Sequence, residues 1–373
     1  MSDWSNCRNI LVIRPDNMGD LLMSTPAIRA LKESFNARIT VLTSSMAAGI
    51  ARVVPEISEV MVYDLPWVKT KETVSPDVFT EIIVQISSKK FDAAVIFTVY
   101  SQNPLPTAML AYLAGIPKRL AYCRENPYEL LSNWVPDKEP YTEIKHQVRR
   151  DLDLVAAVGA ISRDEYLSVS VPDDSNSLDT KLRQLGVDPV KPWLILHPGV
   201  SEKKREYPLE RWIETGRILS EEYQLLITGA NAEGFLITQL SEGIGGNAFS
   251  LAGKLTLPEF ILLIKRAPLV ISVNTGTIHI AAACKTPVIV LYALTNPQHS
   301  PWKVPGKVLP FGVQEDLKSR NEVIRFVNDS YFSQFPSMVM PDEIVLAARE
   351  ILKGSGGIIP ELLQGTEATS ILS

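Results

Sequence analysis

Three short segments of the 373-residue sequence place glycine and polar or charged residues directly after runs of hydrophobic residues. They are RPDNMGD at 14–20, HPGVSEKKREYP at 197–208 and SVNTGTIH at 272–279. Each run is a predicted strand, and ligands of open α/β sheets bind outside the carboxyl ends of the strands. We therefore look for catalytic and binding residues in these three segments.

The first segment contains a candidate general base. Asp20 stands at the start of a predicted helix, where the helix dipole favours an ionised carboxylate. Such a carboxylate, within hydrogen-bond reach of a sugar hydroxyl, removes the proton as the hydroxyl attacks. The alternative is an ordinary cap or first-turn acid. The turn has only one glycine, Gly19, so it lacks the Gly-x-Gly-x-x-Gly pattern of a dinucleotide-binding domain.

The third segment is a candidate anion site. Asn274, Thr275, Gly276 and Thr277 lie between a predicted buried strand and a helix. Backbone N–H groups at the start of that helix, with a glycine that allows close approach and two hydroxyls beside it, suit a phosphate. An ordinary helix N-cap explains the same residues, and the sequence leaves both interpretations open.

The second segment carries three consecutive cations, Lys203, Lys204 and Arg205. A run of basic residues is often only a solvated face. At the carboxyl end of a strand, however, a cation can neutralise a diphosphate leaving group.

Other reactive residue types carry less information. His279 is expected in the core, and His197 is expected to support a turn. The four histidines lack the spacing of a metal site, and Ser201 lacks the Gly-x-Ser-x-Gly pattern of a hydrolase. A net charge of -5 argues against general nucleic-acid binding.

The cellular setting is an expectation from composition. Three scattered cysteines give no disulfide framework, which favours a reducing compartment. The polar start resembles no signal peptide, and no hydrophobic run reaches the roughly 18 residues that span a bilayer. We expect a soluble cytoplasmic protein, with association at the inner membrane surface left open.

The elements that position these segments alternate between strand and helix. In the first half, we expect strands at 10–13, 38–43, 60–63, 92–99 and 165–171. A helical pattern follows the first of these strands, and another covers 107–115. The hydrophobic run 81–86 is part of the same alternating pattern. In the second half, strands are expected at 193–199, 224–229, 269–274 and 287–293, with helices at 208–223, 257–267, 276–285 and 341–354. This rhythm predicts parallel sheets covered by helices.

The length exceeds that of a single hydrophobic core and predicts two domains. We place the first domain at 1–171, a polar linker flanked by prolines at 172–191, the second domain at 192–354 and a tail at 355–373.

Taken together, six ordered motifs between residues 9 and 352 resemble glycosyltransferase family 9, which includes the lipopolysaccharide heptosyltransferases. They are ILVIRPDNMGDLLMSTPAIRALK, LAYLAGIPKRLAY, HPG followed by KREYPLERW, LLITGANAE, LAGKLTLPEFILLIKRA and VISVNTGTIHIAAACKTPVIVLYALTNP. The resemblance implies an α/β GT-B fold, in which two Rossmann-like, doubly wound domains face a central cleft. It assigns the acceptor to the first domain and the nucleotide-sugar donor to the second.

The resemblance also implies an inverting, metal-independent transfer without a cofactor, typically of heptose from ADP-heptose to a hydroxyl of a glycan or glycoconjugate. The family's catalytic aspartate falls on Asp20 and its basic-loop lysine on Arg205. The family's acid before Thr275 is Asn274 here, which leaves the exact sugar and nucleotide open. Glu233 matches the position that contacts the ribose.

These assignments give one set of candidate site residues. Asp20 and Arg205 are the expected catalytic residues; donor binding is expected from Ser201, Lys204, Glu233, Asn274, Thr275, Gly276 and Thr277, and acceptor binding from Asn17, Arg119 and Arg124. The expected partners are a nucleotide sugar and a glycan, lipid-linked or small-molecule acceptor, with no nucleic acid. A catalytically silent nucleotide-sugar-binding protein and a GT-B nucleotide-sugar epimerase are the alternatives.

Overall fold

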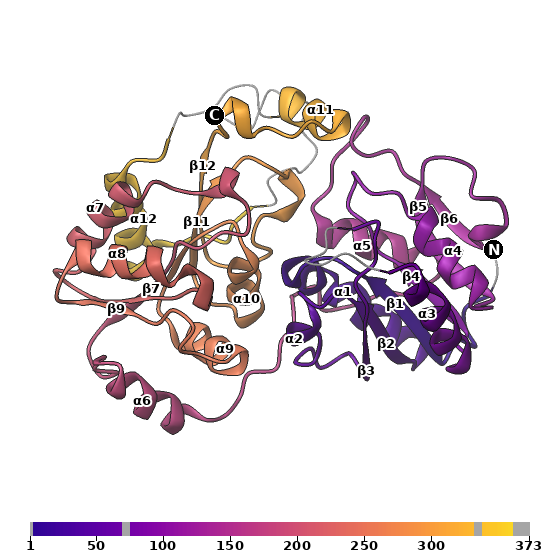
Figure 1. Ribbon diagram of the computed structural model, residues 1–373, viewed down its shortest axis with the longest axis horizontal. Coiled ribbons are helices and arrows are strands. Elements are labelled where there is room, and N and C mark those ends of the chain that lie inside the picture. The colour runs from indigo at the N-terminus through magenta and orange to yellow at the C-terminus, as the bar shows by residue number, and fades with distance from the viewer. Residues whose placement is uncertain (1–2, 69–74, 332–337, 361–373) are drawn as a thin grey trace. The chain divides into compact units, whose positions relative to one another are not determined.

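The structure is a computed structural model that describes residues 3–68, 75–331 and 338–360. The chain divides between Ser170 and Val171 into two compact units. Each unit has one parallel sheet with helices on both of its faces (Figure 1). This is the α/β architecture of Rossmann-like units that the alternating pattern predicts.

The first unit contains a six-stranded sheet in the order β3-β2-β1-β4-β5-β6. Its strands are β1 (Asn9–Arg14), β2 (Arg38–Thr43), β3 (Glu59–Val62), β4 (Ala93–Ile96), β5 (Lys118–Cys123) and β6 (Asn133–Pro136). Its helices are α1 (Met18–Phe35), α2 (Ala48–Ala51), α3 (Asp77–Ser88), α4 (Leu105–Leu113), η1 (Tyr128–Leu130) and α5 (Gln147–Ala156). The order is that of a Rossmann sheet, with the change of direction between β1 and β4.

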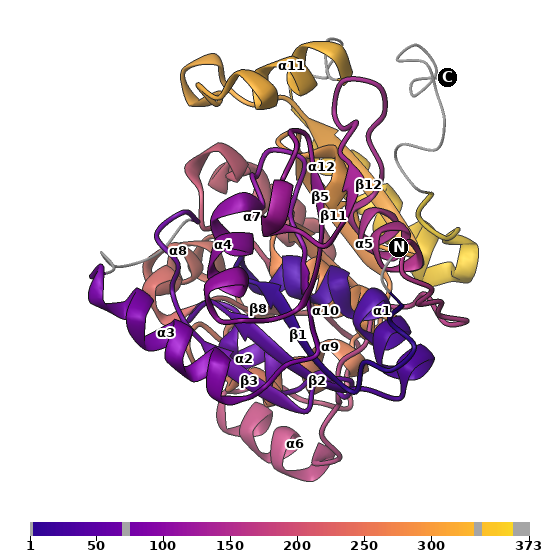
Figure 2. The ribbon, with the colours of Figure 1, turned by 90° about the vertical axis from the view of Figure 1, so that its right-hand side faces the viewer.

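Hydrophobic burial on both faces explains the continuous apolar run of β1. Leu11 and Ile13 pack with Ile82 of α3 and Ala108 of α4 in one cluster. The helices α1 and α5 pack against each other on the other face, and Figure 2 shows β1 between these two helix pairs. The sheet therefore holds the end of β1 at a fixed place on its carboxyl edge.

The second unit repeats the same topology in the order β12-β11-β10-β7-β8-β9. Its strands are β7 (Trp193–His197), β8 (Gln224–Ile227), β9 (Ala248–Ser250), β10 (Val270–Val273), β11 (Val288–Ala293) and β12 (Gly306–Phe311). Its helices are α6 (Ser175–Gln184), α7 (Leu209–Leu219), α8 (Gly234–Ile244), α9 (Leu257–Arg266), α10 (Gly276–Cys284), α11 (Glu322–Tyr331) and α12 (Pro341–Glu350). Short helical turns are η2 (Lys203–Arg205), η3 (Asn231–Glu233), η4 (Pro297–His299), η5 (Glu315–Leu317) and η6 (Ile351–Ser355).

Helices cover both faces of the second sheet as well. The helices α7, α8 and α12 share one hydrophobic cluster with β7, for which Trp212, Ile237 and Ile344 supply central side chains. The helix α9 packs against both α6 and α10, and none of these three helices contributes to this cluster. The change of direction lies between β7 and β10, which are hydrogen-bonded neighbours. Both switch points therefore sit at the carboxyl ends of strands that precede the segments of interest.

One expectation about the middle of the chain is wrong. Residues 165–171 do not form a strand, because their backbone groups bond to side chains of α1 instead: Arg29 Nη1 donates to Tyr166 O and Ser168 N donates to Thr25 Oγ1. The predicted linker at 172–191 contains α6, which is fixed to α9 by an ion pair between Lys181 and Glu259 at 2.7 Å.

The run 81–86 lies inside α3, and the helix expected at 341–354 is α12 followed by η6. Of the predicted tail, 361–373 lie outside the described residues. Among the helices that the structure describes, none is long and apolar enough to cross a membrane.

Candidate functional site

Asp20 lies at the carboxyl edge of the first sheet, beside the switch point. It is the third residue of α1, which follows β1 after a loop of three residues. Its Oδ2 atom accepts a hydrogen bond from the Asn17 N–H at 3.2 Å, and its Oδ1 atom lies 3.5 Å from Arg14 Nη2. The residue is 9% exposed. Asp20 thus accepts a hydrogen bond at the start of α1 and still presents a carboxylate near the edge. The interpretations of this acid as a first-turn residue and as a general base are therefore compatible.

A second carboxylate lies at the same edge. Asp16 Oδ2 is 3.4 Å from Arg14 Nε, and Asp16 Oδ1 accepts a hydrogen bond from Gln102 Nε2 at 2.6 Å. The backbone carbonyl of Asp16 accepts a bond from Ser44 Oγ, which follows β2. Burial raises the pKa of Asp16, and the neighbouring Arg14 charge opposes this shift. Side chains that follow β1, β2 and β4 therefore meet at one place.

The candidate acceptor residues are in three different settings. The backbone of Asn17 contributes to the α1 start, and Arg124 follows β5 at the carboxyl edge. The Arg124 guanidinium donates to Glu139 O at 2.7 Å and lies 3.5 Å from Asp137, with its side chain 32% exposed.

Arg119, by contrast, lies near the amino end of β5, away from the edge that carries Asp20. Its guanidinium donates to three backbone carbonyls, those of Ile116, Glu129 and Leu130, and the residue is 8% exposed. These bonds give Arg119 a structural role, so we leave it out of the proposed acceptor site.

Asp151 of α5 lies beneath this edge. It accepts hydrogen bonds from Ser24 Oγ at 2.7 Å and Gln147 Nε2 at 2.8 Å, and it is 1% exposed. Burial raises the pKa of Asp151 from 3.8 to about 6, although Arg14 and these bonds oppose the shift. The folded protein therefore binds this proton more tightly than the unfolded chain does.

The raised pKa of Asp151 predicts a pH-dependent difference in stability between the protein and the variant Asp151→Asn. Because the pKa is raised on folding, stability falls as the pH rises from about 4 to above 6, by roughly 3 kcal/mol for a shift of about two units. Asp151→Asn should lack this component, so the variant gains stability relative to the parent as the pH rises. Urea unfolding of both proteins between pH 4 and 7.5 measures the difference.

The variant Asp153→Asn is the matched control, because Asp153 lies on the same helix with its side chain 37% exposed. A parallel pH dependence for the parent and Asp151→Asn would show that Asp151 is ionised throughout this range in the folded protein.

The second unit brings two of the sequence segments together at its carboxyl edge. Arg205 of η2 donates from Nη1 to the backbone carbonyl of Asn274 at 3.3 Å. Its Nη2 atom lies 3.4 Å from Glu202 Oε2, and Lys204 Nζ lies 3.1 Å from the same oxygen. The loop after β7 therefore places a cation beside the start of α10.

Asn274 has a structural role that the sequence does not reveal. Its side-chain amide donates to Ala293 O and accepts from Ala293 N, both at 3.1 Å. It also approaches Thr295 Oγ1 at 3.4 Å, and the residue is 7% exposed. An aspartate accepts but does not donate when ionised. The asparagine thus fastens the end of β10 to the end of β11 and fixes the carbonyl that Arg205 contacts.

The first turn of α10 is the candidate anion site. Thr275 is the N-cap residue in an extended conformation, but its side chain makes no cap bond. Its buried Oγ1 atom has no hydrogen-bond partner among the described residues. Gly276 and Thr277 follow as the first helical residues, and N–H groups in a helix's first turn have no partner within the helix.

Glu233 and Ser201 occupy the loops after β8 and β7. Glu233 Oε2 accepts a bond from Ala230 N at 2.7 Å. Its carboxylate lies so close to Gly199 that a Cβ on that glycine would be 2.1 Å from Oε1, so any other residue there would displace the Glu233 carboxylate. Ser201 is exposed. These two side chains flank the same edge as Arg205.

His197 and His279 have structural settings. His197 bonds through Nδ1 to Thr228 Oγ1 at 2.9 Å, and burial lowers its pKa to about 4, so the ring is neutral at physiological pH. His279 is buried, as the sequence suggests. Within the described residues, no group of three or more histidine, cysteine, aspartate or glutamate side chains is arranged to hold a metal ion.

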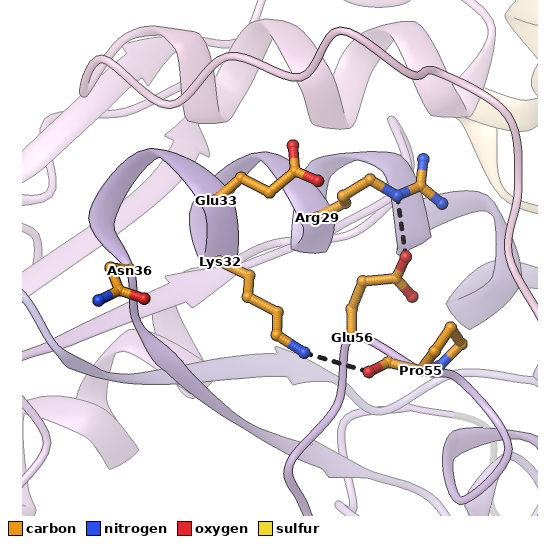
Figure 3. A pocket seen from close by; sticks show the side chains of 6 residues that line it. All are labelled: Arg29, Lys32, Glu33, Asn36, Pro55 and Glu56. Carbon is orange, nitrogen blue, oxygen red and sulfur yellow. Dashed lines mark hydrogen bonds and ion pairs between the residues drawn. The ribbon is translucent and has the colours of Figure 1, made fainter.

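A hollow of about 380 Å³ lies elsewhere, at the far end of α1 (Figure 3). Its polar groups pair with each other: Arg29 Nε donates to Glu56 at 2.8 Å and Lys32 Nζ donates to Pro55 O at 3.1 Å. Because α1 starts at the carboxyl edge and runs away from it, this hollow is separate from Asp20.

Comparison with known proteins decides the family. The model of glycosyltransferase family 9 (heptosyltransferase) matches residues 80–321. The chain belongs to this family. It is therefore a glycosyltransferase, as the six ordered motifs predict.

The relatives of this family 9 glycosyltransferase are distant in sequence, but the alignments cover most of each chain. Lipooligosaccharide heptosyltransferase 2 of Haemophilus influenzae is 24% identical over 311 residues, which cover 79% of this chain and 85% of the relative. Lipopolysaccharide heptosyltransferase 3 of Escherichia coli is 25% identical over 349 residues, covering 90% and 95%. The structure of E. coli ADP-heptose lipopolysaccharide heptosyltransferase II aligns with a TM-score of 0.71 at 19% identity, covering 93% of this chain and 99% of that one. This last similarity supports the fold.

Sequence reasoning missed several residues at the edges of this family 9 protein. Arg14 and Asp16 lie in the first segment, yet they were not singled out, and Gln102 and Thr295 lie after other strands. A charged residue at the very end of a buried strand was the available signal, because an ion there needs a partner.

Proposed function

We propose that this family 9 glycosyltransferase transfers heptose from ADP-heptose to a hydroxyl of a glycan or glycoconjugate, with inversion. The observation that carries the proposal is the contact between Arg205 and the backbone of Asn274, since it puts a fixed cation beside the open first turn of α10. A cation and helix N–H groups are the partners that a diphosphate needs. The names of the heptosyltransferase relatives supply the sugar and the nucleotide.

In this proposal the second unit binds the donor. Arg205 and Lys204 contact the diphosphate together with N–H groups of Thr275, Gly276 and Thr277. Glu233 accepts hydrogen bonds from the ribose hydroxyls, and Ser201 lies beside the diphosphate. Asn274 acts through the backbone that it fixes.

The first unit supplies the base and the acceptor contacts. Asp20 takes the proton of the acceptor hydroxyl as the oxygen attacks the anomeric carbon. The bond between that carbon and the diphosphate oxygen breaks, and its electron pair leaves with ADP. Arg205, Lys204 and the α10 N–H groups stabilise the negative charge of ADP. Asn17 and Arg124 contact the acceptor.

No step of this scheme requires a metal ion or a cofactor, because protein cations perform the charge stabilisation. Assays with added EDTA and with added Mg²⁺ should therefore give equal rates.

We propose a cytoplasmic reaction, at the inner membrane surface when the acceptor is attached to a lipid.

A thermal-shift titration tests the donor directly. ADP-heptose should stabilise the protein more than ADP-glucose, UDP-glucose, GDP-mannose or NAD at equal concentration. A ligand at 100 times its dissociation constant adds roughly 2.7 kcal/mol to the stability of the folded state.

A stronger response to another nucleotide sugar would contradict the proposed donor. No response to any nucleotide would overturn the proposed donor site in the second unit.

A further inference from the structure

Arg14 is a fully buried cation whose partners lie at the proposed catalytic edge. Its side chain has no exposed surface, and the only carboxylates with which it forms ion pairs in the described residues are Asp16 and Asp20, at 3.4 and 3.5 Å. Its Nη1 atom is buried without a hydrogen-bond partner there. Arg14 is therefore held mainly by charge.

The other buried arginines of this unit bond differently. Arg119 donates to three backbone carbonyls, and Arg150 donates to Thr98 O at 3.0 Å and to Asp137 at 2.9 Å. Those short contacts are typical of arginines that hold loops together. The longer contacts of Arg14 fix no loop carbonyl, so stability alone does not account for a buried guanidinium at this place.

Asp16 competes with Asp20 for the Arg14 charge. Each carboxylate contacts a different nitrogen of the guanidinium, and Asp16 is held in place by Gln102 from the loop after β4. Removing the negative charge of one carboxylate removes its repulsion of the other, so the attraction between Arg14 and the remaining carboxylate is less opposed.

We propose that Arg14 is a positioning residue that holds the Asp20 carboxylate in place for proton transfer, and that Asp16 weakens the attraction between Arg14 and Asp20. The inference rests on the proposed function and deepens it. The other charged groups that face Arg14 are Asp151 and Arg150, both on α5. The ion pairs that Arg14 forms in the described residues are with Asp16 and Asp20, which leaves Asp16 as the competitor in direct contact with the guanidinium.

The consequence for the reaction is that Arg14 and Asp16 together set how readily Asp20 accepts the proton. When Asp20 takes the acceptor proton, its attraction to Arg14 disappears and Arg14 is left with Asp16. The ion pair with Asp16 thus limits the charge that remains unpaired after the transfer. Neither Arg14 nor Asp16 needs to touch the substrate for this effect.

Carboxyl ¹³C resonances of labelled aspartate test the coupling without any turnover. Asp16→Asn should lower the titration midpoint of Asp20 by roughly one pH unit, since a like charge nearby shifts a carboxylate by about that much. Asp20→Asn should lower the midpoint of Asp16 equally, because the coupling between two sites is reciprocal. Comparison of the variant spectra assigns both resonances.

Asp64→Asn is the matched control. Asp64 follows β3 at the same edge and bonds to Ser45 N at 2.9 Å, so its removal should leave both midpoints unchanged. Arg14→Gln should raise both midpoints, and Arg14→Lys should restore them in part. Asparagine still accepts the Gln102 bond, so Asp16→Asn tests the proposal even if Arg14→Gln does not fold.

An unchanged Asp20 midpoint in Asp16→Asn overturns the proposal, and so does a shift in only one member of the pair. The result is separate from the proposed function, because the titration needs neither donor nor acceptor.

In a transferase assay, Asp16→Asn should also move the acid limb of kcat/KM to lower pH and leave the KM for ADP-heptose unchanged. A uniform loss of activity without a moved limb would indicate a purely structural role and would overturn the proposal.

Discussion

Asp20→Asn should lower kcat by about 10²- to 10⁴-fold, the range for loss of a general base, and leave the affinity for ADP-heptose unchanged. The amide has nearly the shape of the carboxylate but accepts no proton at neutral pH. The donor groups lie in the second unit, so the variant should bind the nucleotide sugar as the parent does. Release of ADP with an acceptor that the parent glycosylates measures kcat, and calorimetry measures donor binding.

The fold of Asp20→Asn should be intact, which makes the kinetic result interpretable. The new Oδ1 atom still accepts a bond from the Asn17 N–H and Arg14 keeps its ion pair with Asp16, so the variant should fold, at a cost above the roughly 1 kcal/mol of a weakened helix cap because Arg14 loses one of its two carboxylate partners. Asp64→Asn, at the same edge, should keep full activity. Near-normal turnover by Asp20→Asn would remove Asp20 from the role of base.

The sequence predicts the fold of both units well because their central strands are buried on both faces. Ile10 to Ile13 and Val288 to Ala293 form continuous apolar runs, and such runs separated by amphipathic helices have few alternatives to a parallel sheet. It fails at 165–171, where alternation of apolar and polar residues imitates a strand. There, bonds to Arg29 and Thr25 of α1 replace the ladder, and no local pattern reveals them.

The site was predictable as far as it depends on topology. Residues that follow strands meet at the carboxyl edge, which brought Arg205 to Asn274 across more than sixty positions of sequence. The role of the Asn274 amide was not predictable, because its partner Ala293 is a backbone group of another strand. The same limit applies to Arg119, since strand direction decides which edge it faces and three loop carbonyls decide its bonds.

Arg205→Met should lower kcat/KM by about 10²- to 10³-fold, the effect of removing one preorganised group that stabilises developing charge. The diphosphate would lose the cation that Glu202 and the Asn274 carbonyl hold beside α10. Donor affinity should fall as well, because the charge of the diphosphate is already present in the ground state. Steady-state kinetics with ADP-heptose and thermal-shift titration measure the two effects.

Arg205→Lys separates charge from geometry. Lysine keeps the cation and loses the planar fork, so much of the activity should return if the diphosphate needs charge alone. Lys203→Met is the matched control, since Lys203 is an exposed cation of the same turn. Equal losses in Arg205→Met and Lys203→Met would mean that the loop attracts the donor only by its total charge. A loss confined to Arg205→Met would instead tie donor recognition to the contact that joins η2 to the start of α10.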